Sequence, residues 1–392
     1  MHLEPFQVAI PDDAIDDLHR RIDATRWPDR LEDVAWEHGT ELGYLRDLIG
    51  YWRNGFDWRR YEARINTHPQ FIAHFDGLAT HMIHARSPHA HATPLLLMHG
   101  WPGSIVEFLE VIPRLTEPER FGGSAKDACH VVCPSLPGYG FSQAPQHRGM
   151  GPKQVAERHL KLMRNIGYER FFAQGGDWGA IIARFLPELA GDRLLGLHLN
   201  LVTPDAPAGL DDAEALCTRE ERALLARQEA AKFDKLGYAH VQGTRPQTVG
   251  YGLSDSPVGL CAWITEKFHA WSDHNGDLRD AISWDDLLGN VSIYWFTNSI
   301  ASSMRLYREA YDSFARGEFP RPGAVQPLGV AIYPAEMFRA PKAWIEHDHH
   351  LIHWFEADRG GHFAALEQPA IFAQDVLAFS AALHAGDRHN DA

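Results

Sequence analysis

The stretch from Arg170 to Ile182, RFFAQGGDWGAII, decides the fold of this chain. The apolar residues before Gly175 predict a buried strand, and the residues after Gly179 are compatible with a helix. Between them stands Gly-x-Asp-x-Gly, whose glycines allow a cramped turn that leaves Asp177 above the sheet edge. This pattern is typical of a nucleophile elbow with aspartate in the position of serine. Asp177 as a simple helix cap is the alternative, but a cap does not require glycine on both sides.

The same alternation of strand and helix continues on both sides of the elbow. Short apolar runs at Pro94–Met98 and Val131–Pro134 predict buried strands, and Ser104–Leu115 and Lys153–Ile166 predict helices. Further strands are predicted at Leu328–Ile332 and Leu351–Glu356, and the final helix is expected over Ile371–Leu383. Strands alternating with helices predict an α/β fold with a mostly parallel central sheet flanked by helices, here the α/β-hydrolase fold.

Two parts of the chain lack this alternation. Residues 1–90 begin with a short strand expected at Phe6–Ile10 and continue as a helical meander, with helices expected at Ala14–Thr25 and Glu41–Phe56. Residues 206–320 are helical, which predicts a cap, or lid, inserted into the core. We therefore expect an N-terminal module over 1–90, a first core part over 91–205, the cap over 206–320 and a second core part over 321–392.

Composition excludes several kinds of partner. The formal net charge of −15 opposes binding to nucleic acid or to acidic membranes, and no run of basic residues offsets it. The start of the chain lacks signal-peptide character, and no apolar segment reaches the length of a membrane span. The four cysteines lack a redox or zinc spacing, so we expect free thiols. These features predict a cytoplasmic protein; its oligomeric state, a homodimer included, is left open.

The aspartate at the elbow indicates the chemistry. Serine must lose its proton as it attacks a carbonyl, whereas a carboxylate at a helix N-terminus is already ionised near neutral pH. It can displace a leaving group at a saturated carbon without a base. Asp177 therefore points to epoxides or alkyl halides, and its product is an ester on the enzyme that must then be hydrolysed.

Hydrolysis of that ester requires a histidine with an orienting acid late in the chain, because the order in this fold is nucleophile, acid, histidine. His362 follows a predicted strand on a glycine-rich loop. The acid should follow an earlier strand, which makes Glu336 the leading candidate, with Asp348 and Asp358 as rivals. The ester oxyanion needs two backbone N–H donors, and we expect them from Trp101, in His-Gly-Trp-Pro-Gly, and from Trp178.

Motifs along nearly the whole chain resemble the microsomal-type epoxide hydrolase family. They are FQVAIPD and TRWPD near the start, then LLLMHGWPGS, PSLPGYGFS and GGDWGA, then GYAHVQGTRPQTVGYGLSDSPVGL with WITEKF, YWFTNSIASSMRLYREA and RGGHFAALEQP. The resemblance implies conversion of epoxides to vicinal diols, with Asp177 as nucleophile, Glu336 as acid and His362 as base. It also implies that two cap tyrosines, Tyr238 and Tyr307, hydrogen-bond the epoxide oxygen. A phenol with a pKa of about 10 stays protonated at neutral pH, so it can donate to a developing alkoxide.

The resemblance also bears on location and on substrate. Some animal members carry a membrane anchor ahead of the FQVAIPD-like segment, which begins here at Phe6, so this chain resembles the soluble microbial branch, and detoxification is the expected role. The aromatic texture of the cap predicts an apolar or aryl epoxide as substrate, with water as the second reactant. Trp101, Trp178 and Trp263 are the expected substrate contacts. No cofactor is expected.

Three other interpretations were weighed. A haloalkane dehalogenase resembles this chain in fold and also uses an elbow aspartate, with Trp178 available to hold the halide. A binding protein without catalysis would not need all five residues expected to take part in the reaction, which are Asp177, Glu336, His362, Tyr238 and Tyr307. A metal site at His347–His350 with His353 is disfavoured because no HExxH pattern is present and alternate residues of a strand face opposite ways. We therefore expect no metal.

Overall fold

A computed structural model describes residues 1–207, 209–320 and 325–390, with side chains described through residue 385. Within these residues nine strands form one sheet, in the order β1-β2-β3-β5-β4-β6-β7-β8-β9. The strands are β1 (His2–Phe6), β2 (Gln70–Phe75), β3 (Leu78–Ala85), β4 (Thr93–Met98), β5 (Cys129–Pro134), β6 (Phe171–Gly175), β7 (Leu194–Leu199), β8 (Leu328–Ile332) and β9 (Leu351–Glu356).

The sheet is parallel from β5 to β9 and antiparallel from β1 to β5. The expected mostly parallel sheet is thus confirmed. Strand β6, which leads into the Gly-x-Asp-x-Gly segment, lies inside the parallel part between β4 and β7. Because ligands of open α/β sheets bind at the carboxyl ends of such strands, this topology places Asp177 at the favoured edge.

Helices cover both faces of the sheet, and strand β4 shows why its sequence is apolar throughout. Successive side chains of a strand point to opposite faces. Leu96 and Met98 accordingly belong to one core cluster, while Leu95 and Leu97 belong to the other, and all four are fully buried. The helices outside the cap and the N-terminal segment are α4 (Val111–Thr116), α5 (Pro152–Asn165), α6 (Asp177–Ala183), α7 (Leu186–Ala190), α14 (Lys342–Asp348), α15 (Ala364–Glu367) and α16 (Pro369–Asn390).

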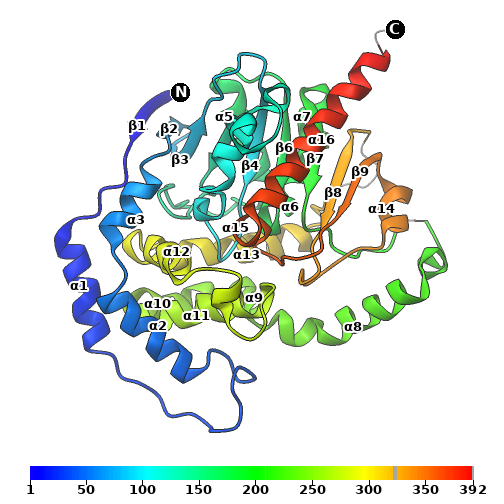
Figure 1. The fold of residues 1–392 in the computed structure, drawn as a ribbon. Helices are drawn as coiled ribbons and strands as arrows, with labels where there is room; N and C mark the ends of the chain where they lie inside the picture. Colours follow the sequence, from blue (N-terminus) through cyan, green and yellow to red (C-terminus); the bar gives the residue numbers. More distant parts are fainter. Residues whose placement is uncertain (208, 321–324, 391–392) are drawn as a thin grey trace.

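The cap lies between β7 and β8 in the sequence and below the sheet in Figure 1. It consists of α8 (Arg219–Lys235), α9 (Gly237–Thr244), α10 (Pro246–Asp255), α11 (Pro257–Trp271), α12 (Trp284–Phe296) and α13 (Ile300–Ala315). Helices α12 and α13 are separated by a short break, where Asn298 adopts a positive φ of 49°. The cap boundary expected at 320/321 adjoins residues 321–324, which lie outside the described residues.

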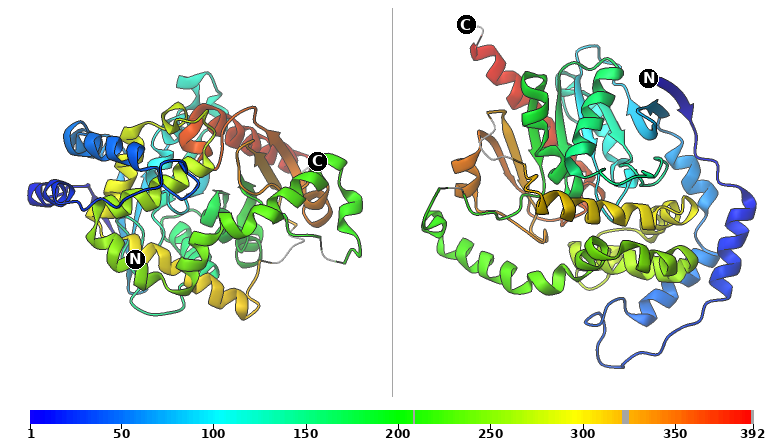
Figure 2. Two further views of the ribbon diagram at one scale, coloured as in Figure 1. Left: turned by 90° about the horizontal axis from the view of Figure 1, so that it is seen from below. Right: turned by 180° about the vertical axis from the view of Figure 1, so that it is seen from behind.

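The N-terminal segment runs along the cap, as both views of Figure 2 show for its helices α1 (Asp12–Asp23) and α2 (Leu42–Asn54). Helix α3 (Trp58–Ile65) completes its helical part. Hydrogen bonds tie it to α12: Tyr51 Oη donates to Asp285 Oδ1 at 2.7 Å, and Trp52 Nε1 donates to Ser292 Oγ at 3.0 Å. The cap therefore packs between this segment and the sheet.

The same segment supplies three strands, and the expected helical meander included neither β2 nor β3. The strand expected at Phe6–Ile10 is wrong in position, since β1 ends at Phe6. Strands β2 and β3 form a hairpin through Asp76-Gly77, both with positive φ. Asp-Gly between two apolar runs is a strong hairpin signal, so the sequence contained the information.

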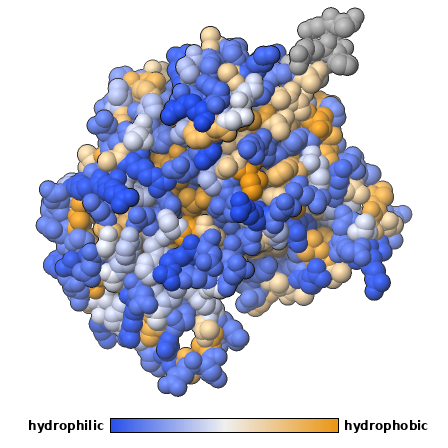
Figure 3. Space-filling model, in the orientation of Figure 1, coloured by the Kyte–Doolittle hydropathy of each residue, from blue (hydrophilic) through white to orange (hydrophobic). Residues whose placement is uncertain are grey.

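In Figure 3, hydrophilic residues cover most of the visible face, and apolar residues form small separate areas. No helix of the described chain has the length and apolar character that a membrane crossing requires. All four cysteines are buried and free, which confirms that expectation.

A buried acid fixes α16 to the sheet. Asp375 Oδ2 lies 2.8 Å from His198 Nε2 on β7, and Asp375 Oδ1 lies 2.6 Å from His353 Nε2 on β9. Burial raises the pKa of Asp375, but the charge and hydrogen bond of His198, together with those of His353, hold it below its ordinary value. A depressed carboxyl pKa stabilises the fold above the unfolded-state pKa, and this stabilisation is lost as the pH falls through the folded-state value.

We predict that Asp375→Asn destabilises the protein by about 3 kcal/mol, because it leaves the buried imidazole of His198 and the half-buried imidazole of His353 without their shared carboxylate. Urea unfolding at pH 7 measures the loss. Asp280→Asn, on the exposed cap surface, is the control and should change stability by less than about 0.5 kcal/mol. A variant as stable as the unmodified protein would show that this network does not hold α16 in place.

Candidate active site

The turn after β6 is a strained elbow. Asp177 has a φ of +47°, a conformation that a non-glycine residue rarely adopts. Its glycine neighbours are required by close packing: a Cβ on Gly179 would lie 2.2 Å from the Met98 carbonyl oxygen, and one on Gly176 would lie 2.7 Å from the Asn200 side chain. The strain is therefore held by the sheet around it, as is common at functional sites.

The Asp177 carboxylate lies between a backbone donor and a histidine. The N–H of Trp101 donates to Oδ1 at 2.7 Å, and His362 Nε2 lies 3.3 Å from Oδ2. The helix cap of α6 is Gly176, and no side-chain hydrogen bond caps this helix, so capping does not account for Asp177. The N–H of Trp178 belongs to the first turn of α6, where helix donors have no partner within the helix.

His362 is oriented by Glu336 from its other ring nitrogen. Both Glu336 carboxylate oxygens lie 3.0 Å from His362 Nδ1, and both side chains are 2% exposed. The rivals lie elsewhere: Asp348 contacts His347 at 2.7 Å, and Asp358 is exposed. Burial lowers the pKa of His362, but the charge of Glu336 and the hydrogen bonds with Asp177 and Glu336 hold it well above its ordinary value.

Four aromatic side chains surround this site. Trp101 stacks on Tyr238 with ring centres 5.2 Å apart, and Trp178 meets the ring of Tyr307 edge-on at 4.7 Å. The Tyr307 hydroxyl is buried and makes no well-formed hydrogen bond in the described part of the chain. Burial and the negative charge of Asp177 raise the pKa of both phenols, so both stay protonated at neutral pH.

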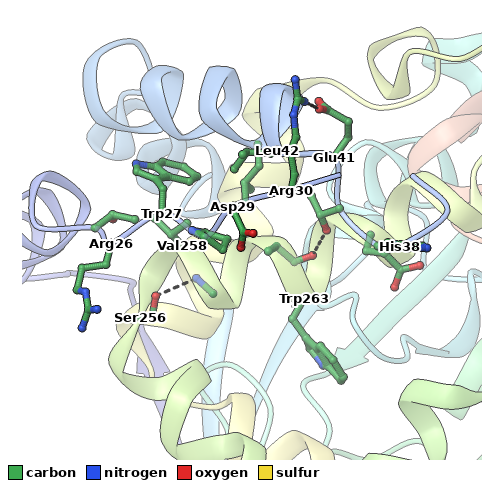
Figure 4. Close-up of a pocket in the computed structure, with 18 of the residues that line it drawn as sticks. Arg26, Trp27, Asp29, Arg30, His38, Glu41, Leu42, Ser256, Val258 and Trp263 are labelled. Carbon is green, nitrogen blue, oxygen red and sulfur yellow. Dashed lines mark hydrogen bonds and ion pairs between the residues drawn. The ribbon is translucent and has the colours of Figure 1, made fainter. Parts of the chain in front are cut away.

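Trp263, the third expected substrate contact, lies on cap helix α11. It is among the residues that line a pocket of about 1420 Å³ between residues 21–45 and the cap residues 255–266. Figure 4 shows Trp263 extending from the cap helix on the side opposite to Trp27 and Leu42. Its indole N–H donates to Gln242 Oε1 at 3.1 Å. Neither Asp177 nor His362 lines this pocket, and the contact of Trp263 with substrate stays a prediction.

A small cavity behind the nucleophile contains two polar residues that the sequence analysis missed, Glu107 and Asn200. Its volume of about 10 Å³ suits about one water molecule, and Asp177 and His362 also line it. Burial raises the pKa of Glu107 to about 8. A single acid inside the apolar run from Ile105 to Leu109 was the available signal.

The described residues contain one cluster that could be considered for a metal, formed by His198, His353 and Asp375. Its histidine nitrogens lie 2.6 and 2.8 Å from the carboxylate, which are hydrogen-bond distances. The remaining ring nitrogen of His198 has no partner in the described chain, whereas metal-bound histidines usually donate from that position. These features fit a structural hydrogen-bond network.

The parallel sheet, the strained elbow and the histidine after the last strand define an α/β-hydrolase whose nucleophile position carries a carboxylate. The sequence matches two known families, "Epoxide hydrolase N terminus" over residues 3–108 and "alpha/beta hydrolase fold" over residues 93–215. Fold class and sequence family thus agree along the first half of the chain.

Full-length relatives extend this agreement. A relative from Stigmatella aurantiaca is 48% identical over 378 residues, covering 95% of this chain and 84% of its own. Epoxide hydrolase 1 of Oryctolagus cuniculus is 37% identical over 401 residues, covering 96% and 88%. The solved structure of Aspergillus niger epoxide hydrolase, 33% identical, superposes with a TM-score of 0.85 over 97% of this chain and 96% of its own. The chain belongs to the epoxide hydrolase family, whose reaction consumes an epoxide and water.

We predict that Glu336→Gln lowers kcat by roughly 100-fold or more, because the amide no longer favours the imidazolium or its tautomer. Asp348→Asn and Asp358→Asn should keep kcat within about twofold. Steady-state turnover of an epoxide such as styrene oxide measures all three. Equal losses in the three variants would contradict the assignment of Glu336.

Proposed function

We propose that the protein opens epoxides in two steps through an ester on Asp177. The observation that carries this proposal is the placement of one carboxylate between the Trp101 N–H and His362, with Glu336 behind the histidine. In the first step an Asp177 oxygen attacks a ring carbon and the carbon–oxygen bond of the epoxide breaks. Tyr238 or Tyr307 gives its proton to the released oxygen.

In the second step water attacks the Asp177 carbonyl carbon. His362 takes one proton from this water, and the N–H groups of Trp101 and Trp178 stabilise the oxyanion. Collapse of the tetrahedral intermediate expels the diol oxygen, which receives the proton from His362. The carboxyl proton of Asp177 then returns to the phenolate, so the enzyme is restored and one water has been added to the epoxide.

Several features support an apolar or aryl substrate. The walls near Asp177 are the rings of Trp101, Trp178, Tyr238 and Tyr307, which offer apolar surface and two phenol donors. We also propose the chain division 1–90, 91–205, 206–320 and 321–392, with the cap supplying both tyrosines. A homodimer is a further proposal, which the molar mass in solution tests.

Halide displacement by Asp177 is the other reaction that this elbow could perform. The indole N–H groups of Trp101 and Trp178 are buried without partners in the described residues, so either could hold a halide. The phenol pair suits an alkoxide better, and the family relationship favours epoxides. Chloride release from a haloalkane, without diol from an epoxide, would support the alternative.

We predict that His362→Asn forms the Asp177 ester but fails to hydrolyse it, because only the second step needs the base. Mixing this variant with styrene oxide and measuring intact mass should show one substrate mass added per chain, on the peptide that contains Asp177. Asp177→Asn should add no mass. Free diol produced by His362→Asn at the normal rate, without adduct, would contradict the two-step mechanism.

We predict that Tyr238→Phe combined with Tyr307→Phe lowers the rate of ester formation by at least about 100-fold, since no acid remains to protonate the leaving oxygen. Each single variant should lose less, because the other phenol remains. Pre-steady-state quenching measures ester formation, and circular dichroism checks the fold. Near-normal ester formation in the double variant would remove the acid role from both tyrosines.

A further inference from the structure

The end of the cap helix α11 is joined directly to the loop that carries His362. The N–H of His362 donates to the Trp271 carbonyl at 2.9 Å, and the N–H of Gly360 donates to Asp273 Oδ2 at 2.7 Å. Trp271 is the last residue of α11, and Asp273 lies two residues beyond it. These bonds connect the cap to two backbone positions within two residues of the histidine.

Glu367 on α15 completes this junction from the other side. Its Oε1 accepts the N–H of Phe363 at 3.0 Å, and its Oε2 accepts the N–H of Asp273 at 2.8 Å. The residue is 7% exposed. A single buried carboxylate thus receives one donor from the histidine loop and one from the cap. We call Asp273 and Glu367, with the backbone groups that they bind, the cap–histidine junction.

Gly361 indicates independently that these segments must approach closely. A Cβ at this position would lie 2.4 Å from the Trp271 carbonyl oxygen and 3.1 Å from the Asp273 nitrogen. Any larger residue would push the histidine loop away from the cap. The contact therefore depends on the sequence of the loop as well as on the two acids.

Trp271 places this junction beside both halves of the site. Its ring lies 5.2 Å from the ring of Tyr238 and 5.0 Å from the ring of His362, measured between centres. The residue that accepts the His362 N–H therefore also packs against a phenol proposed to act on the epoxide. A shift of the α11 end relative to the loop would change the position of His362 relative to Asp177.

We propose that Asp273 and Glu367 are positioning residues that hold His362 in place against the cap for hydrolysis of the Asp177 ester. This inference rests on the proposed two-step function. Neither acid contacts the nucleophile among the described contacts, and both act on the loop through backbone N–H groups. Ester hydrolysis needs His362 in place, whereas ester formation needs Asp177 and the phenols. The junction should therefore affect the second step selectively.

The test compares Glu367→Gln, Asp273→Ala and Asp273→Asn with the exposed control Glu346→Gln. Rapid-quench single turnover with styrene oxide measures ester formation and ester hydrolysis separately. Glu367→Gln places an amide NH2 against a backbone donor, and we expect hydrolysis to slow by roughly tenfold or more, with ester formation within about twofold. Asp273→Ala should act in the same direction. Asp273→Asn keeps an oxygen for the Gly360 N–H and should remain close to the unmodified enzyme.

Hydrogen exchange provides a readout that does not depend on the chemistry. Glu367→Gln and Asp273→Ala should each raise exchange in residues 271–273 and 360–363 together, while the rest of the core stays protected. The proposed role of the junction would be overturned if these variants left both the rate of ester hydrolysis and the hydrogen exchange unchanged. It would also be overturned if they slowed ester formation as much as ester hydrolysis. Absence of any ester in the unmodified enzyme would refute the proposed function instead. The joint rise of hydrogen exchange in residues 271–273 and 360–363 would then still decide whether the junction exists.

Discussion

The structure depends on one constraint, a carboxylate held in a strained turn at the centre of a parallel sheet. Asp177 adopts a left-handed conformation that costs free energy, and it persists because the glycines of the elbow pack against Met98 and Asn200 without room for side chains. As a result, the carboxylate is fixed by the N–H of Trp101 and faces His362. A nucleophile that must attack at a saturated carbon benefits from such fixed geometry.

Much of the fold could be predicted because it depends on local patterns. Continuous apolar runs identified the parallel strands, and Gly-x-Asp-x-Gly identified the elbow between β6 and α6. The hairpin of β2 and β3 was missed although Asp76-Gly77 signalled it, because histidine and threonine interrupt the apolar pattern of its strands. At the break between α12 and α13, Asn298 adopts the left-handed conformation, which asparagine tolerates better than most residues.

In the candidate site, the residues that follow strands could be predicted better than those whose contacts depend on tertiary packing. Asp177, His362 and Glu336 each follow a strand, and parallel strands bring their carboxyl ends to one edge. Chain order therefore predicted the meeting of Asp177 with His362, whereas Glu336 had Asp348 and Asp358 as rivals and was favoured by its position and by the resemblance. Trp263 hydrogen-bonds Gln242 within the cap, and its contact with substrate stays a prediction. Glu107, Asn200, Asp273 and Glu367 were missed because each of their contacts joins segments that are distant in the sequence.

The cap and the loop that carries His362 are joined by hydrogen bonds. The cap contributes Tyr238 and Tyr307 above Asp177, and its α11 end holds the loop of His362 through the cap–histidine junction. The two proposed chemical steps therefore share one scaffold. A single turnover in heavy-oxygen water distinguishes the covalent ester on Asp177 from direct attack of water on the epoxide. With the ester, the label enters the Asp177 carboxylate and is absent from the diol; label in the diol after one turnover would show direct attack by water.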